Sequence, residues 1–97
     1  MTISPKILIV DDEPKLVRLA QELLLATGFT VVTASDGQAA IKTAALEQPD
    51  LILLDIMLPG NMDGYQVAER IRQFSNVPII MLTARDQEQD LLQGFDM

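Results

Sequence analysis

The chain has 97 residues, of which 48% are hydrophobic and only 4% aromatic, so it can form one domain with an aliphatic core. It contains no cysteine and no histidine, which excludes disulfides, thiolate metal sites, phosphohistidine and histidine-ligated zinc. Its net charge of −7 disfavours nonspecific binding to nucleic acid or to anionic membranes. No apolar run approaches the length of a membrane span, and the N-terminus lacks a signal-peptide pattern. We therefore predict a soluble, cytoplasmic domain that binds neither membranes nor nucleic acid directly.

The first half of the chain alternates short β-branched runs with segments of helical periodicity. It predicts a strand at residues 6–10, a helix from Pro14 to about Thr27, a strand at 29–34, and a helix between the turn at 35–37 and Pro49. Pro14 suits a first helical turn, with Asp12 or Glu13 near the cap, and Gly28 is a typical helix stop. Leucines and alanines at helical spacing after Pro14 predict an apolar helix face.

The second half repeats this alternation. It predicts a strand at residues 50–54, a loop at 55–63, a helix from Gly64 to about Phe74, a strand at 79–82, and a short helix at 87–94. The apolar stripe of the helix after Gly64 comprises Tyr65, Val67, Ala68, Ile71 and Phe74. Three of the strands are continuously apolar, which is typical of a parallel sheet with helices on both faces.

Asp55 interrupts the most apolar run of the chain, residues 51–60. An ionised carboxylate is costly to bury, so core formation alone does not explain it. We expect the strand to end at Asp55, leaving its carboxylate at the carboxyl edge of the sheet, where ligands bind in open α/β folds. The plainer interpretation is that Asp55 only caps the following turn.

Asp11, Asp12 and Thr83 also follow apolar strands. If their strands neighbour that of Asp55, three carboxylates and a hydroxyl converge at one edge. Two carboxylates about 4 Å apart repel by roughly 4 kcal/mol at an effective dielectric constant near 20, so a cation is needed. An all-oxygen set indicates Mg²⁺, or Mn²⁺ in its place, and we expect Asp12 to bind it directly and Asp11 through water. Taken singly, the acidic pair can be a helix cap and Thr83 a local hydrogen-bond donor.

Four motifs carry a resemblance to a known family. They are Ile-Leu-Ile-Val-Asp-Asp-Glu at 7–13, Leu-Leu-Asp-Ile-Met-Leu-Pro-Gly at 53–60, Met-Asp-Gly at 62–64, and Pro-Ile-Ile-Met-Leu-Thr-Ala-Arg at 78–85. From about residue 6 to residue 97, the chain resembles the receiver domain of two-component response regulators, most closely receivers that precede winged-helix DNA-binding domains. The resemblance implies an α/β, flavodoxin-like three-layer sandwich whose parallel sheet has the strand order 2-1-3-4.

The resemblance also implies residue roles. Asp55 would be the phosphoacceptor, taking a phosphoryl group from a phosphohistidine of a sensor histidine kinase. Asp11, Asp12, Asp55 and the backbone carbonyl of Met57 would hold Mg²⁺. Phosphoryl transfer depends mainly on positioning and charge neutralisation, so a site without histidine is adequate. The chain would then be a signalling module and not a turnover enzyme.

By the same resemblance, Thr83 would be the switch hydroxyl, and Met57 and Arg85 would tune the lifetime of the phosphoryl group. Asn61 looks like a one-residue insertion, from which we expect a longer loop beside the site and an intact acceptor. An aspartyl-phosphate phosphatase of similar architecture needs a second acid two residues after the nucleophile, where this chain has Met57. A flavin or dinucleotide domain would need a Gly-rich loop after the first strand, and none is present.

The sequence stops before the fifth strand, the Lys-Pro pair and the fifth helix of a receiver. We therefore expect one truncated receiver domain over residues 1–97. An apolar sheet face would be left bare, which predicts self-association or exchange of elements between copies. An alternative follows for the function: a truncated or degenerate receiver that acts as a dimerising interaction module without a phosphorylation switch.

Overall fold

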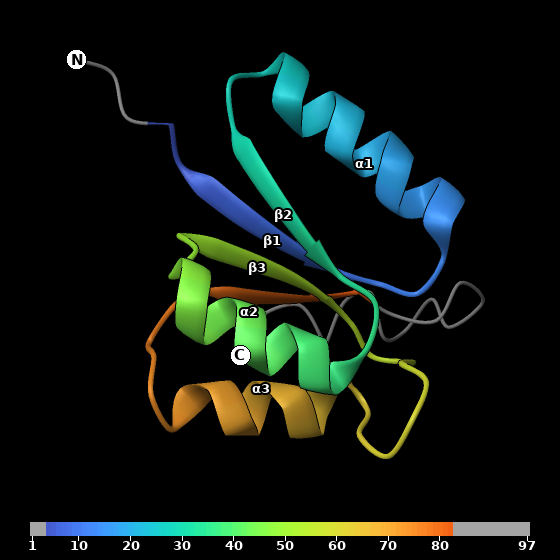
Figure 1. The fold of residues 1–97 in the computed structure, drawn as a ribbon, viewed down its shortest axis with the longest axis vertical. Helices are drawn as coiled ribbons and strands as arrows, with labels where there is room; N and C mark the ends of the chain where they lie inside the picture. Colours follow the sequence, from blue (N-terminus) through green and yellow to red (C-terminus); the bar gives the residue numbers. More distant parts are fainter. Residues whose placement is uncertain (1–3, 83–97) are drawn as a thin grey trace.

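Strands and helices alternate along residues 4–82, the part of the chain that the computed structural model describes (Figure 1). In chain order they are β1 (Lys6–Val10), α1 (Pro14–Ala26), β2 (Thr30–Ala34), α2 (Gly37–Glu47), β3 (Leu51–Asp55), α3 (Gly64–Arg72) and β4 (Ile79–Leu82). The predicted strands are confirmed to within one residue at each end. The predicted helix at 87–94 lies outside the described residues. Within residues 4–82, no helix is long and apolar enough to span a membrane.

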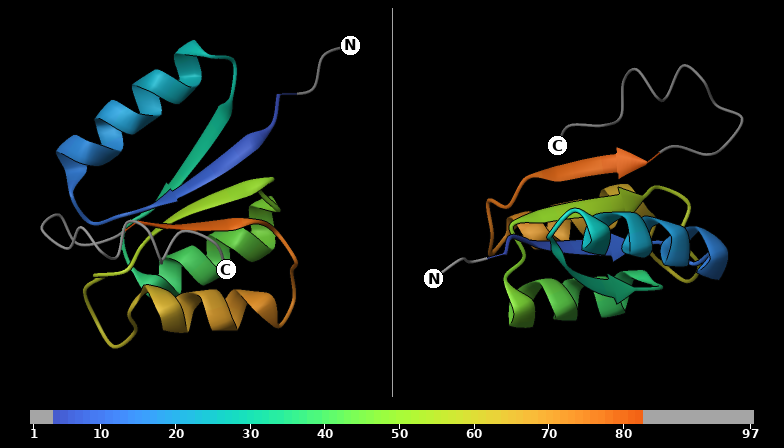
Figure 2. Two further views of the ribbon diagram at one scale, coloured as in Figure 1. Left: turned by 180° about the vertical axis from the view of Figure 1, so that it is seen from behind. Right: turned by 90° about the horizontal axis from the view of Figure 1, so that it is seen from above.

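The four strands form one parallel sheet in the order β2-β1-β3-β4, which confirms the predicted fold class. Helix α1 lies on one face of the sheet, and α2 and α3 lie together on the other (Figures 1 and 2). Leu8 and Ile52 are completely buried beneath α2 and α3, at the centre of the larger core. The other members of that core are Val10, Ala34, Ala40, Ala44, Leu54, Val67, Ala68, Ile71, Val77, Ile79 and Met81.

Local capping chemistry fixes where α2 and α3 begin. The carboxylate of Asp36 accepts a hydrogen bond from the Ala39 amide at 2.8 Å, which confirms the predicted start of α2. Asp63 and Gln66 form a reciprocal capping box at the start of α3, each side chain accepting from the other's amide at 2.9 Å. These caps hold the two loops at the carboxyl edge of the sheet in fixed positions.

The predicted end of the third helix and part of its apolar stripe were wrong. The helix ends at Arg72 instead of Phe74, because the next amides bond three residues back in a tighter turn. Val67 and Ile71 are completely buried against the core, whereas Tyr65 and Phe74 are 43% and 48% exposed. Helical spacing identifies residues that share a face, but the end residues of this short helix project beyond the elements that cover it.

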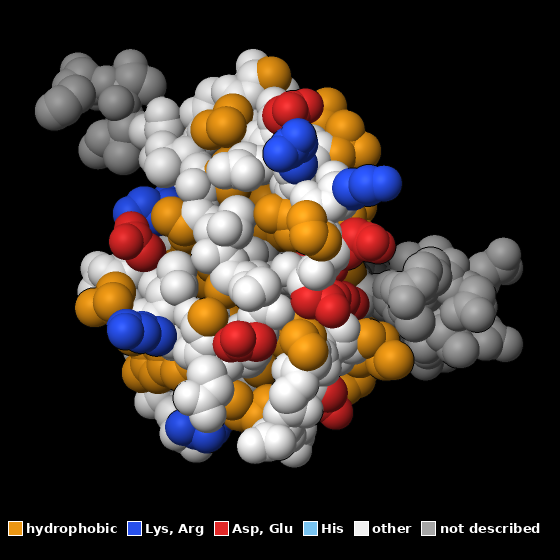
Figure 3. Space-filling model, turned by 45° about the vertical axis from the view of Figure 1, so that its right-hand side comes forward, with side chains coloured by type: hydrophobic (Ala, Val, Ile, Leu, Met, Phe, Trp, Pro, Cys, Tyr) orange, Lys and Arg blue, Asp and Glu red, His pale blue; other side chains and the backbone are white. Residues whose placement is uncertain are grey.

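Helix α1 is amphipathic, yet none of its residues within Pro14–Ala26 is buried. It packs mainly on β2. Leu16, Leu19 and Leu23 are 49%, 56% and 61% exposed, and hydrophobic side chains reach the surface where α1 lies, at the top of Figure 3. On the same side of the sheet, Ile80 of β4 is 36% exposed. Among the described residues, this face is therefore covered only in part.

Candidate functional site

The carboxyl ends of β1 and β3 bring two of the predicted site residues side by side. Val10 of β1 pairs with Leu54 of β3, so the next residues, Asp11 and Asp55, stand at the same level of the sheet. Asp55 is the last residue of β3 and still pairs with Leu82 of β4, so the strand ends at this carboxylate as expected and the following loop begins one residue later than predicted. Sheet register, and not local sequence, thus places these two carboxylates together.

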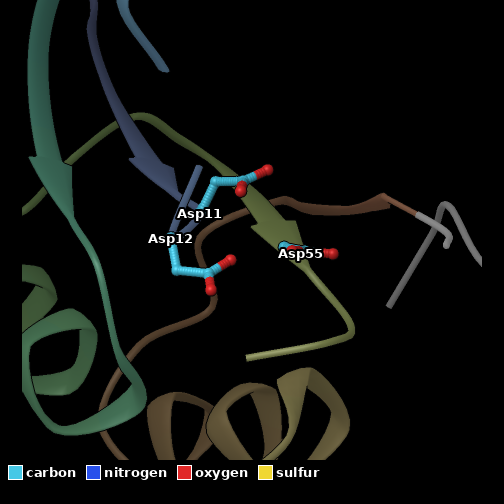
Figure 4. A group of neighbouring side chains, drawn as sticks. All are labelled: Asp11, Asp12 and Asp55. Carbon is cyan, nitrogen blue, oxygen red and sulfur yellow. The ribbon is translucent and has the colours of Figure 1, made fainter. Parts of the chain in front are cut away.

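Asp11, Asp12 and Asp55 form one acidic group. Each offers a carboxylate oxygen, and these three oxygens lie within 4.8 Å of one another. Figure 4 shows the three carboxylates pointing toward the same side of the sheet edge. Asp11 and Asp55 are only 6% and 8% exposed, whereas Asp12 is exposed. This arrangement offers oxygen ligands from two buried groups and one solvent-facing group.

Backbone hydrogen bonds orient both buried carboxylates. Oδ1 of Asp11 accepts from the Glu13 amide at 3.0 Å, and Oδ1 of Asp55 accepts from the Met57 amide at 3.2 Å. In both cases the donor lies two residues further along the chain, the geometry of an Asx turn. Each strand is therefore followed by a turn that its terminal aspartate stabilises, and this turn leaves the carboxylate at the carboxyl edge of the sheet.

The electrostatics of the group oppose ionisation of Asp11. Burial raises the pKa of the Asp11 carboxyl, and the nearby charges of Asp12 and Glu13 raise it further, against the opposing effect of the backbone hydrogen bonds. A site that collects carboxylates at this cost needs positive charge to neutralise it. The donors are all oxygen atoms in a chain without His or Cys, which fits Mg²⁺ or Mn²⁺ and does not fit a structural zinc.

An open cleft surrounds the acidic group, between the turn after β1 and the loop after β3. Its lining comprises Asp11, Asp12, Glu13, Pro14, Leu16, Asp55, Ile56, Met57, Leu58, Pro59, Asp63, Tyr65 and Leu82. Two of these cleft residues, Asp63 and Tyr65, were not among the predicted site residues. The Met-Asp-Gly motif at 62–64 contains a signal for Asp63, because Asp63 follows the loop from the sheet edge and caps α3. Tyr65 lies outside this motif.

Of the remaining predicted site residues that the structure describes, only Met57 is found in the cleft. Met57 lines the cleft, donates its amide to Asp55 and leaves its side chain 59% exposed. Thr83 and Arg85 lie outside the described residues, so their predicted roles stay predictions. Asn61 is exposed and lines a separate groove with Asp36 and Arg70, away from the three carboxylates. The predicted insertion at Asn61 stays a prediction.

Comparison with known proteins matches residues 7–97 to the response regulator receiver domain. The chain is 48% identical over 95 residues to the alkaline phosphatase synthesis transcriptional regulatory protein PhoP of Bacillus subtilis. It is 44% identical over 94 residues to the transcriptional regulatory protein BaeR of Escherichia coli. Each alignment covers 97% of this chain and 39% of the relative, so the chain spans about two fifths of the length of these regulators.

Solved structures agree with this assignment. The BeF3-activated N-terminal receiver domain of Klebsiella pneumoniae RstA superposes with a TM-score of 0.78 at 38% identity, covering 88% of this chain and 72% of that one. The receiver domain of the Pseudomonas aeruginosa sensor histidine kinase PA1611, which has a magnesium ion coordinated in its active-site cleft, superposes with a TM-score of 0.81 at 35% identity, covering 95% and 80%. With the family pattern matched from β1 onward and the same parallel sheet, the chain belongs to the response regulator receiver domain family.

Proposed function

We propose that the chain is a phosphoacceptor module of a two-component system, which accepts a phosphoryl group on Asp55 from a phosphohistidine of a sensor histidine kinase. The observation that carries the proposal is the acidic group itself: three carboxylate oxygens within 4.8 Å, two of them on buried residues. A core gains nothing from such a cluster, because each buried charge costs solvation and repels its neighbours. Receiver domains use this kind of site for phosphoryl transfer.

In the proposed reaction, a carboxylate oxygen of Asp55 attacks the phosphorus atom of the phosphoimidazole. The new phosphorus–oxygen bond forms as the phosphorus–nitrogen bond breaks, and the bonding electron pair stays on the imidazole nitrogen. The Met57 amide holds Oδ1 of Asp55 in place, and the sheet register fixes the backbone. The chain thus contributes mainly positioning, which supplies much of the catalysis in phosphoryl transfer.

Asp11, Asp12, Asp55 and the backbone carbonyl of Met57 are the proposed Mg²⁺ ligands, with Mn²⁺ as a substitute. The ion, when bound, supplies the positive charge that neutralises the phosphoryl oxygens. Asp12 is exposed and suits direct coordination, whereas Asp11 is buried and already accepts the Glu13 amide, which suits contact through water. We retain Thr83 as the switch hydroxyl and Met57 and Arg85 as the residues that tune the phosphoryl lifetime.

Phosphorylation of the 97-residue chain by acetyl phosphate or a purified sensor kinase tests the assignment. We expect one phosphoryl group per chain with Mg²⁺, none with EDTA, and none in Asp55→Asn. Asp63→Asn is the matched control, because it removes one negative charge from the same cleft and keeps a residue type that caps helices well. Equal labelling of Asp55→Asn and the parent would show that Asp55 is not the acceptor.

A second candidate function rests on the partly covered face formed by α1 and β4. Leu16, Leu19, Leu23 and Ile80 are 36% to 61% exposed there, and exposed apolar patches mark interaction surfaces. We propose that two copies of the 97-residue chain associate through this face or exchange elements, acting in the cytoplasm. Multi-angle light scattering should find dimers or larger species at micromolar concentration. A stable monomer with a cooperative melt contradicts the proposal. A change of oligomeric state on phosphorylation would indicate a switch, whereas an unchanged oligomer would indicate a constitutive interaction module.

A further inference from the structure

Helices α2 and α3 each begin with a buried glycine, and the two glycines have different surroundings. Gly64, the first residue of α3, lies directly on the peptide that joins Asp55 to Ile56, and its amide donates to the Ile56 carbonyl at 2.8 Å. A Cβ at Gly64 would lie 2.7 Å from Ile56 Cα and 3.1 Å from the Asp55 carbonyl carbon, and would run into the Asp55 carbonyl oxygen. Nonbonded carbon atoms prefer about 3.5 to 4.0 Å, so a methyl group does not fit.

The three atoms nearest to a Cβ at Gly64 are all backbone atoms, which cannot rotate away as a side chain does. Helix α3 cannot retreat easily either, because Val67, Ala68 and Ile71 are completely buried in the core. The capping box between Asp63 and Gln66 also fixes the first turn of α3. Added volume at Gly64 would therefore displace the end of β3, which carries the Asp55 carboxylate.

We propose that Gly64 is a positioning residue for the phosphoacceptor: the absence of a side chain lets α3 rest on the Asp55–Ile56 peptide, and this contact sets where the Asp55 carboxylate stands relative to Asp11 and Asp12. The inference rests on the proposed function of Asp55. It assigns a site role to a residue that carries no chemistry of its own. Displacing a reacting group by about 1 Å can cost roughly a hundredfold in rate, so a shift of a few tenths of an ångström should cost about tenfold.

Gly37, the first residue of α2, provides a matched control. It too is buried at the first position of a helix, after an aspartate N-cap. A Cβ there would meet Val67 Cγ2 at 2.8 Å and Met62 Cε at 3.2 Å. It would also meet Met62 Cβ at 3.3 Å. All three are side-chain atoms, and none belongs to the acceptor strand. Gly37→Ala should therefore strain the packing between α2 and α3 while leaving the end of β3 in place.

The experiment compares Gly64→Ala, Gly37→Ala and the parent 97-residue chain, each at a temperature well below its melting transition. Isothermal titration gives the Mg²⁺ dissociation constant, and acetyl phosphate with Mg²⁺ gives the rate of phosphorylation. We expect Gly64→Ala to bind Mg²⁺ several-fold more weakly and to be phosphorylated about tenfold more slowly. Gly37→Ala should melt at a lower temperature than the parent but keep both values within about twofold, since it leaves the acceptor strand untouched.

If Gly64→Ala does not fold, Gln66→Ala provides the test, because it loosens the same first turn without adding volume or removing charge. Its control is Gln38→Ala, in the first turn of α2. The proposal is supported if Gln66→Ala is phosphorylated more slowly than the parent while Gln38→Ala is not. Parent-like Mg²⁺ affinity and rate in folded Gly64→Ala, or in Gln66→Ala, overturn the positioning role. A parent chain that neither binds Mg²⁺ nor is phosphorylated on Asp55 instead refutes the proposed function, and the positioning role with it.

Discussion

Replacing Asp11 by Asn should make the magnesium-free chain more stable. Asp11 is 6% exposed, and its carboxylate is within 4.8 Å of those of Asp12 and Asp55. Asn keeps the Oδ1 atom that accepts the Glu13 amide, so the turn after β1 is retained. The substitution therefore removes a buried charge and its repulsion while changing little else in the fold.

The magnitude follows from the charge that folding brings near Asp11. Asp12 is its neighbour in the unfolded chain as well, so the pair that folding creates is Asp11 with Asp55. Two unit charges 4.8 Å apart repel by about 3.5 kcal/mol at an effective dielectric constant near 20. Partial protonation and salt reduce this, and we expect a net gain of about 1.5 kcal/mol, or roughly 6 to 12 °C in melting temperature for a domain of this size.

The gain should depend on pH, with a sign fixed by the pKa of Asp11. Burial raises the pKa of Asp11 above its ordinary value of 3.8, so the folded chain binds this proton more tightly than the unfolded chain. The contribution of Asp11 to stability is therefore complete below pH 3.8 and is lost as the pH rises through the raised pKa. Near pH 4 the parent and Asp11→Asn should differ little, and the difference should widen as the pH rises through the raised pKa of Asp11.

Thermal melts followed by circular dichroism from pH 4 to pH 8, with EDTA and with Mg²⁺, measure both effects. Glu69→Gln controls for overall charge, because it removes an exposed carboxylate from α3. A ligand at ten times its dissociation constant stabilises the folded state by about 1.4 kcal/mol, and Asp11→Asn should gain less than the parent from the same Mg²⁺ concentration. The reasoning is refuted if Asp11→Asn in EDTA at pH 7 is no more stable than Glu69→Gln.

Two further experiments test the core and the loop after β3. Leu54→Ala should lower the free energy of unfolding by about 2 to 5 kcal/mol in urea titrations, because Leu54 is completely buried, whereas Leu46→Ala, at a site 71% exposed, should change it by less than about 0.5 kcal/mol. Equal losses would contradict the assigned core. Deleting Asn61 should leave the Mg²⁺ dissociation constant within about twofold, because Asn61 lines the groove beside Asp36 and not the acidic cleft. A loss of Mg²⁺ binding would show that Asn61 shapes the site.

The sheet and the acidic group could be predicted from the sequence because both follow from short-range rules. Apolar runs separated by helical segments predict a parallel sheet, and all parallel strands end at one edge. Asp11 and Asp55 follow or end such runs, so their proximity needed only the strand order. Coverage of the helices could not be predicted in this way. Leu19 and Phe74 have helical spacing yet are 56% and 48% exposed, because spacing shows which residues share a face and not what packs on it.

The proposed positioning role of Gly64 could not be predicted from the sequence for a related reason. Its closeness to the Asp55–Ile56 peptide is a tertiary contact, created when the buried face of α3 packs on the core. Substitutions at Asp11 and Gly64 should both weaken Mg²⁺ binding but change stability in opposite directions. Removing the Asp11 charge should raise stability, because a buried charge and its repulsion are lost. It should also weaken Mg²⁺ binding, because one of the proposed carboxylate ligands is lost. Adding a methyl group at Gly64 should weaken Mg²⁺ binding and lower stability as well, because it moves Asp55 without removing any charge. Measuring both quantities on both variants therefore separates the electrostatic contribution to the site from the geometric one.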